Sequence, residues 1–449
     1  MKNLFIIACT IYISAAYSQD HFAGINTSNR VGILNANNNP AELSNLSKKI
    51  EINIYGLSFN VANNKIGISD LSSSTNLEDK LFEGTEPVNF RFDGELVGPS
   101  VAMRWKKWGF GFTTKAHAKF DLVDIDTNLG NAILNSDTNI ISSTSINNNY
   151  NQRMNGTSWG EVGLSAARTL FENDKHRFNV GLALKFLFPG SYSNFGLDKF
   201  QGTINTAGGQ AYLSNTTAIV NIAYSGNLAD SFTNFNDYTN SIFGNLNGTA
   251  IDIGFNYQWK DGNKKYKINS GIAIRNIGSM SFKDGNNSST TYQLNIPVAT
   301  LANPGLNLDQ FQDAENLQEV ENILINEGYL NITPNKNDFK AKLPTVFSFY
   351  ADMKIIPKFY VTLYSQQKLN SDNNNSQITS QNVVSLTPRF SLSFFEAYMP
   401  WSNNEVSGVN GGIGFRLYGF YIGSSSVITA LINDSKQGDF YMGFRWAFL

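Results

Sequence analysis

The sequence predicts an all-β protein, a transmembrane antiparallel β-barrel of 14 strands preceded by a short plug segment. Three observations predict it. Segments of 11 to 18 residues alternate between apolar and polar side chains, their short and long connections take turns, and the chain ends in an amphipathic aromatic strand. Soluble sheets also alternate, but their strands average about 5–6 residues, whereas a tilted strand needs about 9–11 to cross a bilayer.

Composition agrees with a barrel that has one face in lipid and one in water. Charged residues make up 16% of the 449, against about 25% in a typical soluble domain. Aromatic residues reach 13%. A formal net charge of -2 provides no basic surface, so nucleic acid is excluded as a partner.

Residues 1–18 are predicted to be a secretory signal peptide. Lys2 gives a positive start, an apolar stretch follows, and Ala16-Tyr17-Ser18 is a small-x-small cleavage pattern. Cys9, the only cysteine, lies in this segment, so disulfides and cysteine-based metal sites are not expected in the exported chain. The expected location is the outer membrane of a Gram-negative-type envelope.

Residues 19–49 are predicted to form the plug, and residues 50–449 the barrel. Asn39, Pro40 and Ala41 suit the start of a helical turn, because Asn can cap it and Pro fits its first position. Glu42 would then lie near the positive end of the helix dipole. Two interpretations stay open: a capped turn packed inside the barrel, or a plug that gates passage.

The alternation defines the strands in order. In residues 247–260, for example, Ile251 and Ile253 share one face while Asp252 shares the other with glycine and amide residues. The predicted strands are 50–62, 88–105, 108–122, 156–171, 177–189, 247–260, 265–283, 343–356, 359–370, 380–386, 390–399, 407–417, 420–428 and 439–449. Short periplasmic turns are predicted at 106–107, 172–176, 261–264, 357–358, 387–389 and 418–419.

The long connections are predicted to be outer loops. Residues 198–226 alternate well enough to form either an outer hairpin, which we favour, or two further strands that would make 16. Residues 309–328 place apolar side chains at helical spacing and predict a short helix, which is either a lid or a partner-binding element. The asparagine-rich stretches 145–155 and 370–376 are predicted to be mobile.

Charged residues on the strands are expected to face the lumen, because charge is costly in lipid. The candidates are Arg104, Lys115, His117, Lys119, Glu161, Asp252, Arg275, Asp352, Lys354, Arg416 and Arg445. They would either pair across the lumen or select a substrate. For Lys115, His117 and Lys119 the alternative to a plain polar wall is a cationic site for a carboxylate ligand.

No catalytic constellation is found. The three histidines form no metal-binding motif, and no glycine loop has the spacing that holds a phosphate. No cofactor or metal is therefore expected, and the chain is not expected to be an enzyme.

The last strand carries the aromatic face expected of an assembly signal. Phe440, Phe444, Trp446 and Phe448 lie on one face and would be recognised by the barrel-assembly machinery, with outer-membrane lipid as the lasting partner. Phe444→Arg is expected to place a charge in lipid, and the same change at Gly443 to be milder if the lumen has room.

The N-terminal residues Phe22-Ala23-Gly24, Arg30 and Asn39-Pro40-Ala41-Glu42-Leu43 resemble the plug of the long-chain fatty-acid transporter (FadL) superfamily. Within it, the likeness is to barrels of the phylum that uses type IX secretion, including the PorV-like and PorQ-like barrels. The resemblance implies uptake of hydrophobic substrates for some members and roles in secretion for others.

Two functions follow as hypotheses. A transporter or channel for a hydrophobic small molecule predicts a continuous apolar pocket and a lateral opening at a kinked strand. A non-transporting barrel subunit of an envelope or type IX secretion-related complex predicts a lumen filled by charge pairs and a partner surface outside.

Overall fold

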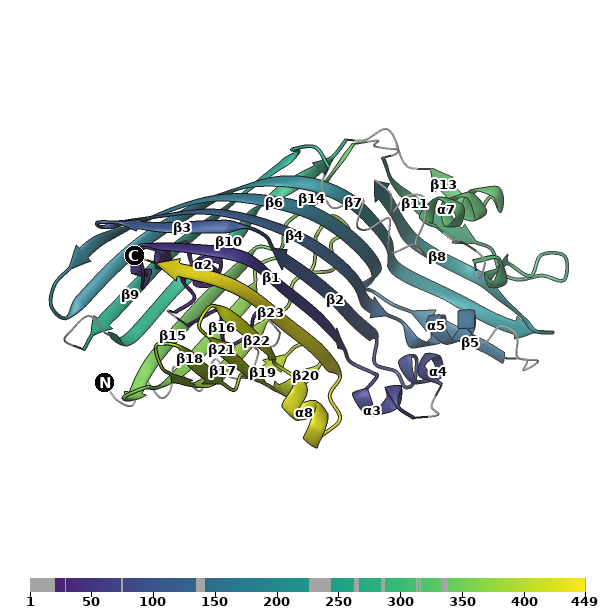
Figure 1. The fold of residues 1–449 in the computed structure, drawn as a ribbon. Coiled ribbons are helices and arrows are strands. Elements are labelled where there is room, and N and C mark those ends of the chain that lie inside the picture. The colour runs from purple at the N-terminus through teal and green to yellow at the C-terminus, as the bar shows by residue number, and fades with distance from the viewer. Residues whose placement is uncertain are drawn as a thin grey trace, which may run out of the picture.

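A closed ring of antiparallel strands forms the body of the protein (Figure 1). The computed structural model describes residues 21–448 except 29, 74–75, 135–141, 226–243, 262–265, 284–286, 312–313, 315 and 333–337. In this part of the chain 14 strands close the ring, since β1 (Ile50–Asn63) pairs with β23 (Gln437–Phe448) from Ile50↔Phe448 to Ala62↔Gln437. The predicted 14-stranded barrel is confirmed, whereas the predicted signal peptide lies outside the described residues.

Several strands of the ring are interrupted and carry two labels. After β1 the ring runs through β2 (Val88–Val97) with β3 (Ser100–Trp105), β4 (Trp108–Ile125), β6 (Asn151–Glu172), β7 (His176–Ala207), β9 (Gly248–Lys260), β10 (Tyr266–Phe282), β14 (Phe339–Lys342) with β15 (Val346–Ile356), β16 (Phe359–Lys368), β17 (Val383–Ser391), β18 (Phe395–Tyr398) with β19 (Trp401–Asn404), β20 (Gly408–Gly411) with β21 (Ile413–Leu417), β22 (Phe420–Ser424) and β23.

Helices and further strands lie inside the ring or beyond its outer end. Inside are α2 (Gly32–Asn38) and the 3-10 helix η1 (Pro40–Asn45). The outer connections hold α3 (Ile68–Leu71), α4 (Leu77–Leu81), α5 (Thr127–Leu134), β5 (Ser142–Asn147), β8 (Gln210–Ser225), β11 (Ser288–Ile296), β12 (Leu306–Asn307), η3 (Leu308–Phe311), α7 (Leu317–Asn326), β13 (Leu330–Ile332) and α8 (Val427–Ile432). Among the described residues no helix is both long and apolar enough to cross a bilayer.

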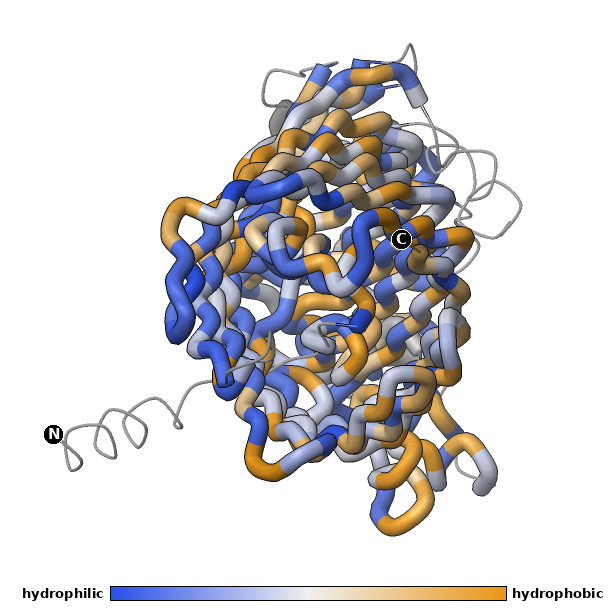
Figure 2. The backbone as a smooth tube through the Cα atoms, turned by 60° about the vertical axis from the view of Figure 1, so that its left-hand side comes forward, coloured by the Kyte–Doolittle hydropathy of each residue, from blue (hydrophilic) through white to orange (hydrophobic). Residues whose placement is uncertain are grey.

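The wall presents its apolar side chains outward and its polar ones inward. Along β9, Ile251, Ile253 and Phe255 are exposed, whereas Asp252 and Asn256, at alternate positions, are buried. Figure 2 shows hydrophobic and hydrophilic residues alternating along the strands. Near the short turns, exposed tryptophans carry basic neighbours over their rings, as Lys106 does at 5.2 Å from Trp105 and Lys267 at 4.8 Å from Trp259. Such an aromatic and basic girdle marks the membrane interface.

Two strand predictions near the C-terminus are wrong. The predicted turn 387–389 lies within β17, and the chain turns instead at 392–394. Pro388 is tolerated there because β17 changes partner, from β19 to β18, beside it. The predicted strand 420–428 ends at Ser424, since Asp439 accepts hydrogen bonds from Ser425 N at 2.7 Å and Ser426 Oγ at 2.6 Å and turns the chain into α8.

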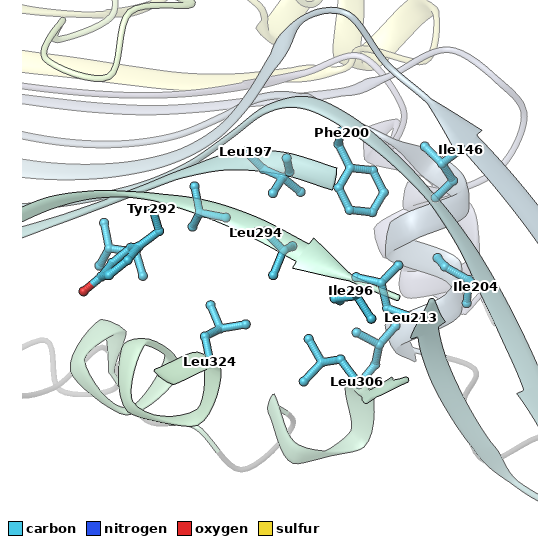
Figure 3. Packing of buried hydrophobic residues seen from close by; sticks show 14 of the residues in the cluster. Ile146, Leu197, Phe200, Ile204, Leu213, Tyr292, Leu294, Ile296, Leu306 and Leu324 are labelled. Atoms are coloured by element: carbon cyan, nitrogen blue, oxygen red, sulfur yellow. The ribbon is translucent and has the colours of Figure 1, made fainter. Parts of the chain in front are cut away.

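Within the predicted range 198–226, the described residues 198–225 form the outer hairpin and add no strand to the ring. The lower half of β7 pairs with β9 in the ring, while its upper half continues outward and pairs with β8. β8 also pairs with β11, and the predicted helix, observed as α7, packs on this sheet through Leu317 and Leu324. Figure 3 shows the resulting outer core, in which Phe200, Leu213 and Leu294 meet. We name this unit of β5, upper β7, β8, β11–β13, η3 and α7 the outer extension.

The outward face makes a depth-dependent prediction. Phe255 lies four residues, or about 13 Å of strand, from the girdle residue Trp259. Phe255→Arg is therefore expected to cost about 2–4 kcal/mol, and Phe444→Arg, beside the 418–419 turn, only about 0–1 kcal/mol. Urea unfolding of both variants in lipid vesicles, with Phe255→Leu as control, measures the difference. Equal costs for the two arginines would contradict the assigned depths.

Gly443→Arg is not the mild change predicted from sequence, because a Cβ there would lie 2.2 Å from Tyr421 OH.

Candidate functional site

The N-terminal segment lies inside the barrel. Residues from Phe22 to Asn45 are mostly buried, and η1 contacts β4, β6, β7 and β9. Asn39 caps η1, because its Oδ1 accepts a hydrogen bond from Ala41 N at 3.0 Å, and Pro40 occupies the first turn. The cap also ties the plug to the wall, since Asn39 Nδ2 donates to the carbonyl oxygen of Phe255 at 2.8 Å. The Asn39-Pro40-Ala41 motif therefore starts η1 and also attaches it to the barrel wall.

Glycines in the wall make room for this motif. A Cβ on Gly181 would lie 2.3 Å from Ala41 N, and one on Gly254 would lie 2.0 Å from Asn39 Oδ1. Real Cβ atoms do not approach other heavy atoms this closely, so a side chain at either position would displace part of the plug. Two other glycines act similarly: Gly109 against the Leu43 carbonyl and Gly271 against Asn39 Nδ2. We name Gly109, Gly181, Gly254 and Gly271 the glycine socket.

A single carboxylate, that of Glu42, fixes η1 to the far side of the socket. Its Oε1 accepts hydrogen bonds from Asn256 Nδ2 at 2.8 Å and Asn269 Nδ2 at 2.9 Å, and also from the Tyr350 hydroxyl. Its Oε2 accepts from Asn45 Nδ2 at 2.8 Å. Four donors, three on different wall strands and one on η1 itself, thus converge on one side chain that is fully buried, which positions the plug more specifically than apolar packing would.

A ladder of charges runs across the inner wall beside the plug. It alternates acids with bases over β2, β4, β6, β7 and β9, so that each charge has an opposite neighbour. The contacts are Lys119–Asp93, Lys115–Glu95 (3.3 Å), His117–Glu95 (3.6 Å), His117–Glu161 (3.8 Å), Lys185–Glu161 (3.8 Å) and Lys185–Asp252 (2.8 Å). The candidate cationic site at Lys115, His117 and Lys119 is thus already paired with wall carboxylates.

The plug joins this ladder through His21. Its Nε2 lies 3.1 Å from Asp93 Oδ1. Burial alone would lower the pKa of His21, but Asp93 outweighs it and raises that pKa above the ordinary 6.5. A raised pKa in the folded state means that this contact stabilises the docked plug below pH 6.5 and weakens as the pH rises through the raised value.

A second buried cluster lies around Glu396 on the opposite wall. Glu396 accepts hydrogen bonds from Arg416 Nε at 2.7 Å, Ser391 Oγ at 2.7 Å and the plug residue Ser28 at 3.0 Å. Arg389 lies 3.8 Å away and pairs at 2.6 Å with Asp352. Asp352 and Arg416, both candidates from sequence, are therefore joined by two residues that were not predicted.

The asparagine-rich connection between β16 and β17 folds into the barrel mouth, so the prediction of a mobile outer loop at 370–376 is wrong. Arg153 donates to the carbonyl oxygens of Asp372 and Gln377, the latter at 3.1 Å. Thr379 Oγ1 donates to Asp121 at 2.5 Å, and Ile378 is fully buried. The stretch 145–155 also belongs to the wall and the outer extension, because it lies in β5 and β6 apart from residues 148–150, which connect them. Plug and inserted loop together occupy the lumen from its two ends.

The remaining candidates lie at the rims or against the plug. Arg275 donates to Asn38 Oδ1 at 3.1 Å and Arg445 lies 2.9 Å from Glu51. Lys354 pairs at 2.6 Å with the half-exposed Asp261 at the periplasmic rim, apart from the buried clusters, and Arg104 is half-buried near the same rim. The assembly-signal residues Phe440, Phe444, Trp446 and Phe448 all face outward and are exposed.

Sequence reasoning missed several members of this site. Asp93 and Glu95 alternate with apolar residues on β2, so the signal that found the other candidates would have found them too. Arg389 was missed because its segment was taken for a turn. Glu42 was noted only for its place in a helix, since nothing local shows which strands a plug will meet.

The wall has an interrupted strand, formed by β2 and β3, but this interruption does not produce the lateral opening that transport through the wall would need. β2 and β3 meet at Gly98-Pro99, but β1 keeps one register with both, and Asn53 Nδ2 donates to the carbonyls of Val97 at 3.3 Å and Gly98 at 3.1 Å. Among the described residues no group of three or more His, Cys, Asp or Glu side chains could hold a metal ion.

These features define a transmembrane β-barrel whose lumen holds an N-terminal plug and an inserted outer loop. A family model described as "Family of unknown function (DUF5723)" matches residues 40–425, and the chain belongs to that family. A search of curated proteins gives no match.

Several solved structures are similar to this chain over most of its length. The toluene transporter TodX of P. putida is 9% identical, with 91% of this chain and 92% of that chain covered and a TM-score of 0.45. A TodX deltaS2S3 mutant monoaromatic hydrocarbon channel is 10% identical, with 91% and 92% covered and a TM-score of 0.46. A FadL homologue of Pseudomonas aeruginosa is 10% identical, with 96% and 98% covered and a TM-score of 0.39.

Proposed function

We propose that this protein is an outer-membrane channel for a small hydrophobic molecule, closed at rest by its N-terminal plug. The observation that carries the proposal is the docking of Asn39–Leu43 in the glycine socket, where η1 meets the wall on several sides. The plug is held by hydrogen bonds and by contacts with carboxylates rather than by a covalent link, so it can leave. The class of cargo rests on the resemblance of the plug motif to that of the FadL superfamily.

A reversible lock of the plug tests this proposal. A Cβ on Gly111 would lie 3.3 Å from the Leu43 side chain, so Leu43→Cys with Gly111→Cys brings two thiols together, in a chain whose only cysteine, Cys9, is replaced by Ser. Cells that express this variant are given the hydrophobic dye N-phenyl-1-naphthylamine. We expect dye entry to fall to the level of cells without the barrel under oxidation and to return with reductant.

The two single-cysteine variants are the matched controls and should admit dye under both conditions. Equal dye entry in the oxidised and reduced double variant would contradict passage through the lumen.

The filled lumen favours a second candidate, a non-transporting barrel of an envelope complex related to type IX secretion. Wall charges pair with one another, and the outer extension has a hydrophobic core of its own that rises beyond the ring. Purification from native membranes at endogenous level distinguishes the candidates. A stoichiometric partner lost on deletion of the outer extension supports this second role, and a barrel purified alone opposes it.

A further inference from the structure

The periplasmic rim of the wall has a notch beside the C-terminal strand. β22 starts after the turn at Tyr418-Gly419 and pairs with β23 only from Phe444 to Tyr441. The last bond on that side joins Arg445 N to Gly419 O at 3.0 Å. Beyond it, residues 446–448 pair with β1 on one edge, and no described strand pairs with the other edge. The notch therefore joins the lumen to the lipid-facing side of the wall.

A cavity of about 550 Å³ occupies this notch. Among the described residues that line it are four cationic side chains and no carboxylate: Arg30, Lys48, Arg416 and Arg445. Two exposed aromatic residues of the outward face, Phe444 and Trp446, complete it. A concentration of positive charge at the edge of an apolar surface attracts an amphiphilic anion, whose charged group binds the cations and whose hydrocarbon part contacts the apolar surface.

Two of the arginines are held in place by hydrogen bonds to the protein. Glu396 accepts from Arg416 Nε at 2.7 Å, and the carbonyl of Tyr418 accepts from its Nη1 at 2.7 Å. Ser391 accepts from Arg30 Nε at 3.0 Å, while Lys48 is exposed. These contacts orient the guanidinium groups without removing the excess of positive charge in the lining.

Arg445 supplies the second, independent observation. Its side chain is 6% exposed, with Nη1 2.9 Å from Glu51 Oε2. Its Nε has no hydrogen-bond partner within the part of the chain that the structure describes, although it is buried. A buried donor without an acceptor costs about 1–3 kcal/mol, so a ligand oxygen at this place would be stabilising.

We propose that the notch binds the phosphate head group of an anionic phospholipid from the periplasmic leaflet. The phosphate lies among Arg30, Lys48 and Arg445, and the acyl chains leave across Phe444 and Trp446 into the bilayer. Arg30 and Lys48 belong to the plug segment, but binding of a lipid here does not require that a molecule passes through the lumen, so the proposal does not depend on the proposed transport.

Quenching of Trp446 by brominated lipid tests the proposal on the full chain in neutral detergent. The signal of Trp446 is the difference between the wild type and Trp446→Phe. We expect brominated phosphatidylglycerol to quench it at lower concentration than brominated phosphatidylcholine. The double variant Arg30→Gln with Lys48→Gln is expected to raise the half-quenching concentration of phosphatidylglycerol about tenfold or more. This is the change in affinity that the loss of one charge-assisted hydrogen bond produces.

Lys49→Gln is the matched control, because Lys49 is also exposed but does not line the cavity, and it should leave quenching unchanged. Equal quenching by both lipids, or no effect of the double variant, would overturn the proposal. Displacement of the lipid by millimolar inorganic phosphate would assign the site to free phosphate and would also overturn it.

Discussion

Glu42→Ala is expected to release the plug while the barrel stays folded. The substitution leaves the Asn45, Asn256 and Asn269 amides and the Tyr350 hydroxyl without their shared acceptor. The Asn45 and Asn256 amides keep other acceptors, but the Asn269 amide and the Tyr350 hydroxyl lose the acceptor that Glu42 provides. Each of these two buried donors left unpaired costs about 1–3 kcal/mol, which weakens the docking of the plug. Entry of N-phenyl-1-naphthylamine into cells should rise above the wild-type level.

The matched control is Glu86→Ala, which removes an exposed carboxylate from the same chain. It should leave dye entry unchanged. Dye entry at the wild-type level in Glu42→Ala cells with normal barrel assembly would show that this carboxylate does not hold the plug.

Glu396→Gln is expected to destabilise the barrel itself. Arg416 and Arg389 would keep their positive charges in the buried wall but lose the carboxylate they share. Removing one partner from a buried ion pair costs about 3–5 kcal/mol, because the remaining charge is uncompensated. Urea unfolding in lipid vesicles should show a lower midpoint for this variant.

Glu83→Gln serves as its control, because Glu83 pairs with Lys80 at an exposed site and such pairs contribute about 0–1 kcal/mol. Equal midpoints for the two variants would mean that the Glu396 cluster contributes nothing to stability beyond an exposed pair.

The direction of each wall side chain can be predicted well from the sequence, because a residue of a membrane-spanning strand faces either the lipid or the lumen. Alternation along β9 assigns Phe255 to lipid and Asn256 to the lumen, and both lie where the pattern indicates. The outer hairpin at 198–226 could also be predicted, from its glycines and polar residues. The failure at Pro388 has a physical cause, because proline signals a turn unless a change of strand partner removes the need for its missing N–H.

The interior could not be predicted in the same way. Asn375 belongs to a stretch with the composition of a loop, yet its side chain accepts from Asn151 and Asn194 on the inner wall. The polar groups of a lumen form hydrogen bonds with an asparagine side chain as well as water does. Composition alone therefore does not distinguish an outer loop from one inserted into the lumen. The need for glycine at Gly181 and Gly254 could likewise not be predicted, because the plug residues that they admit are distant in sequence.

Thiol accessibility at position 41 tests most directly whether the plug occupies the lumen. Ala41 is fully buried against Gly181, so Ala41→Cys in a chain with Cys9→Ser should resist a membrane-impermeant maleimide in the folded barrel. Adding Glu42→Ala should make the same thiol react. Rapid labelling of Ala41→Cys in the background that retains Glu42 would contradict a docked plug.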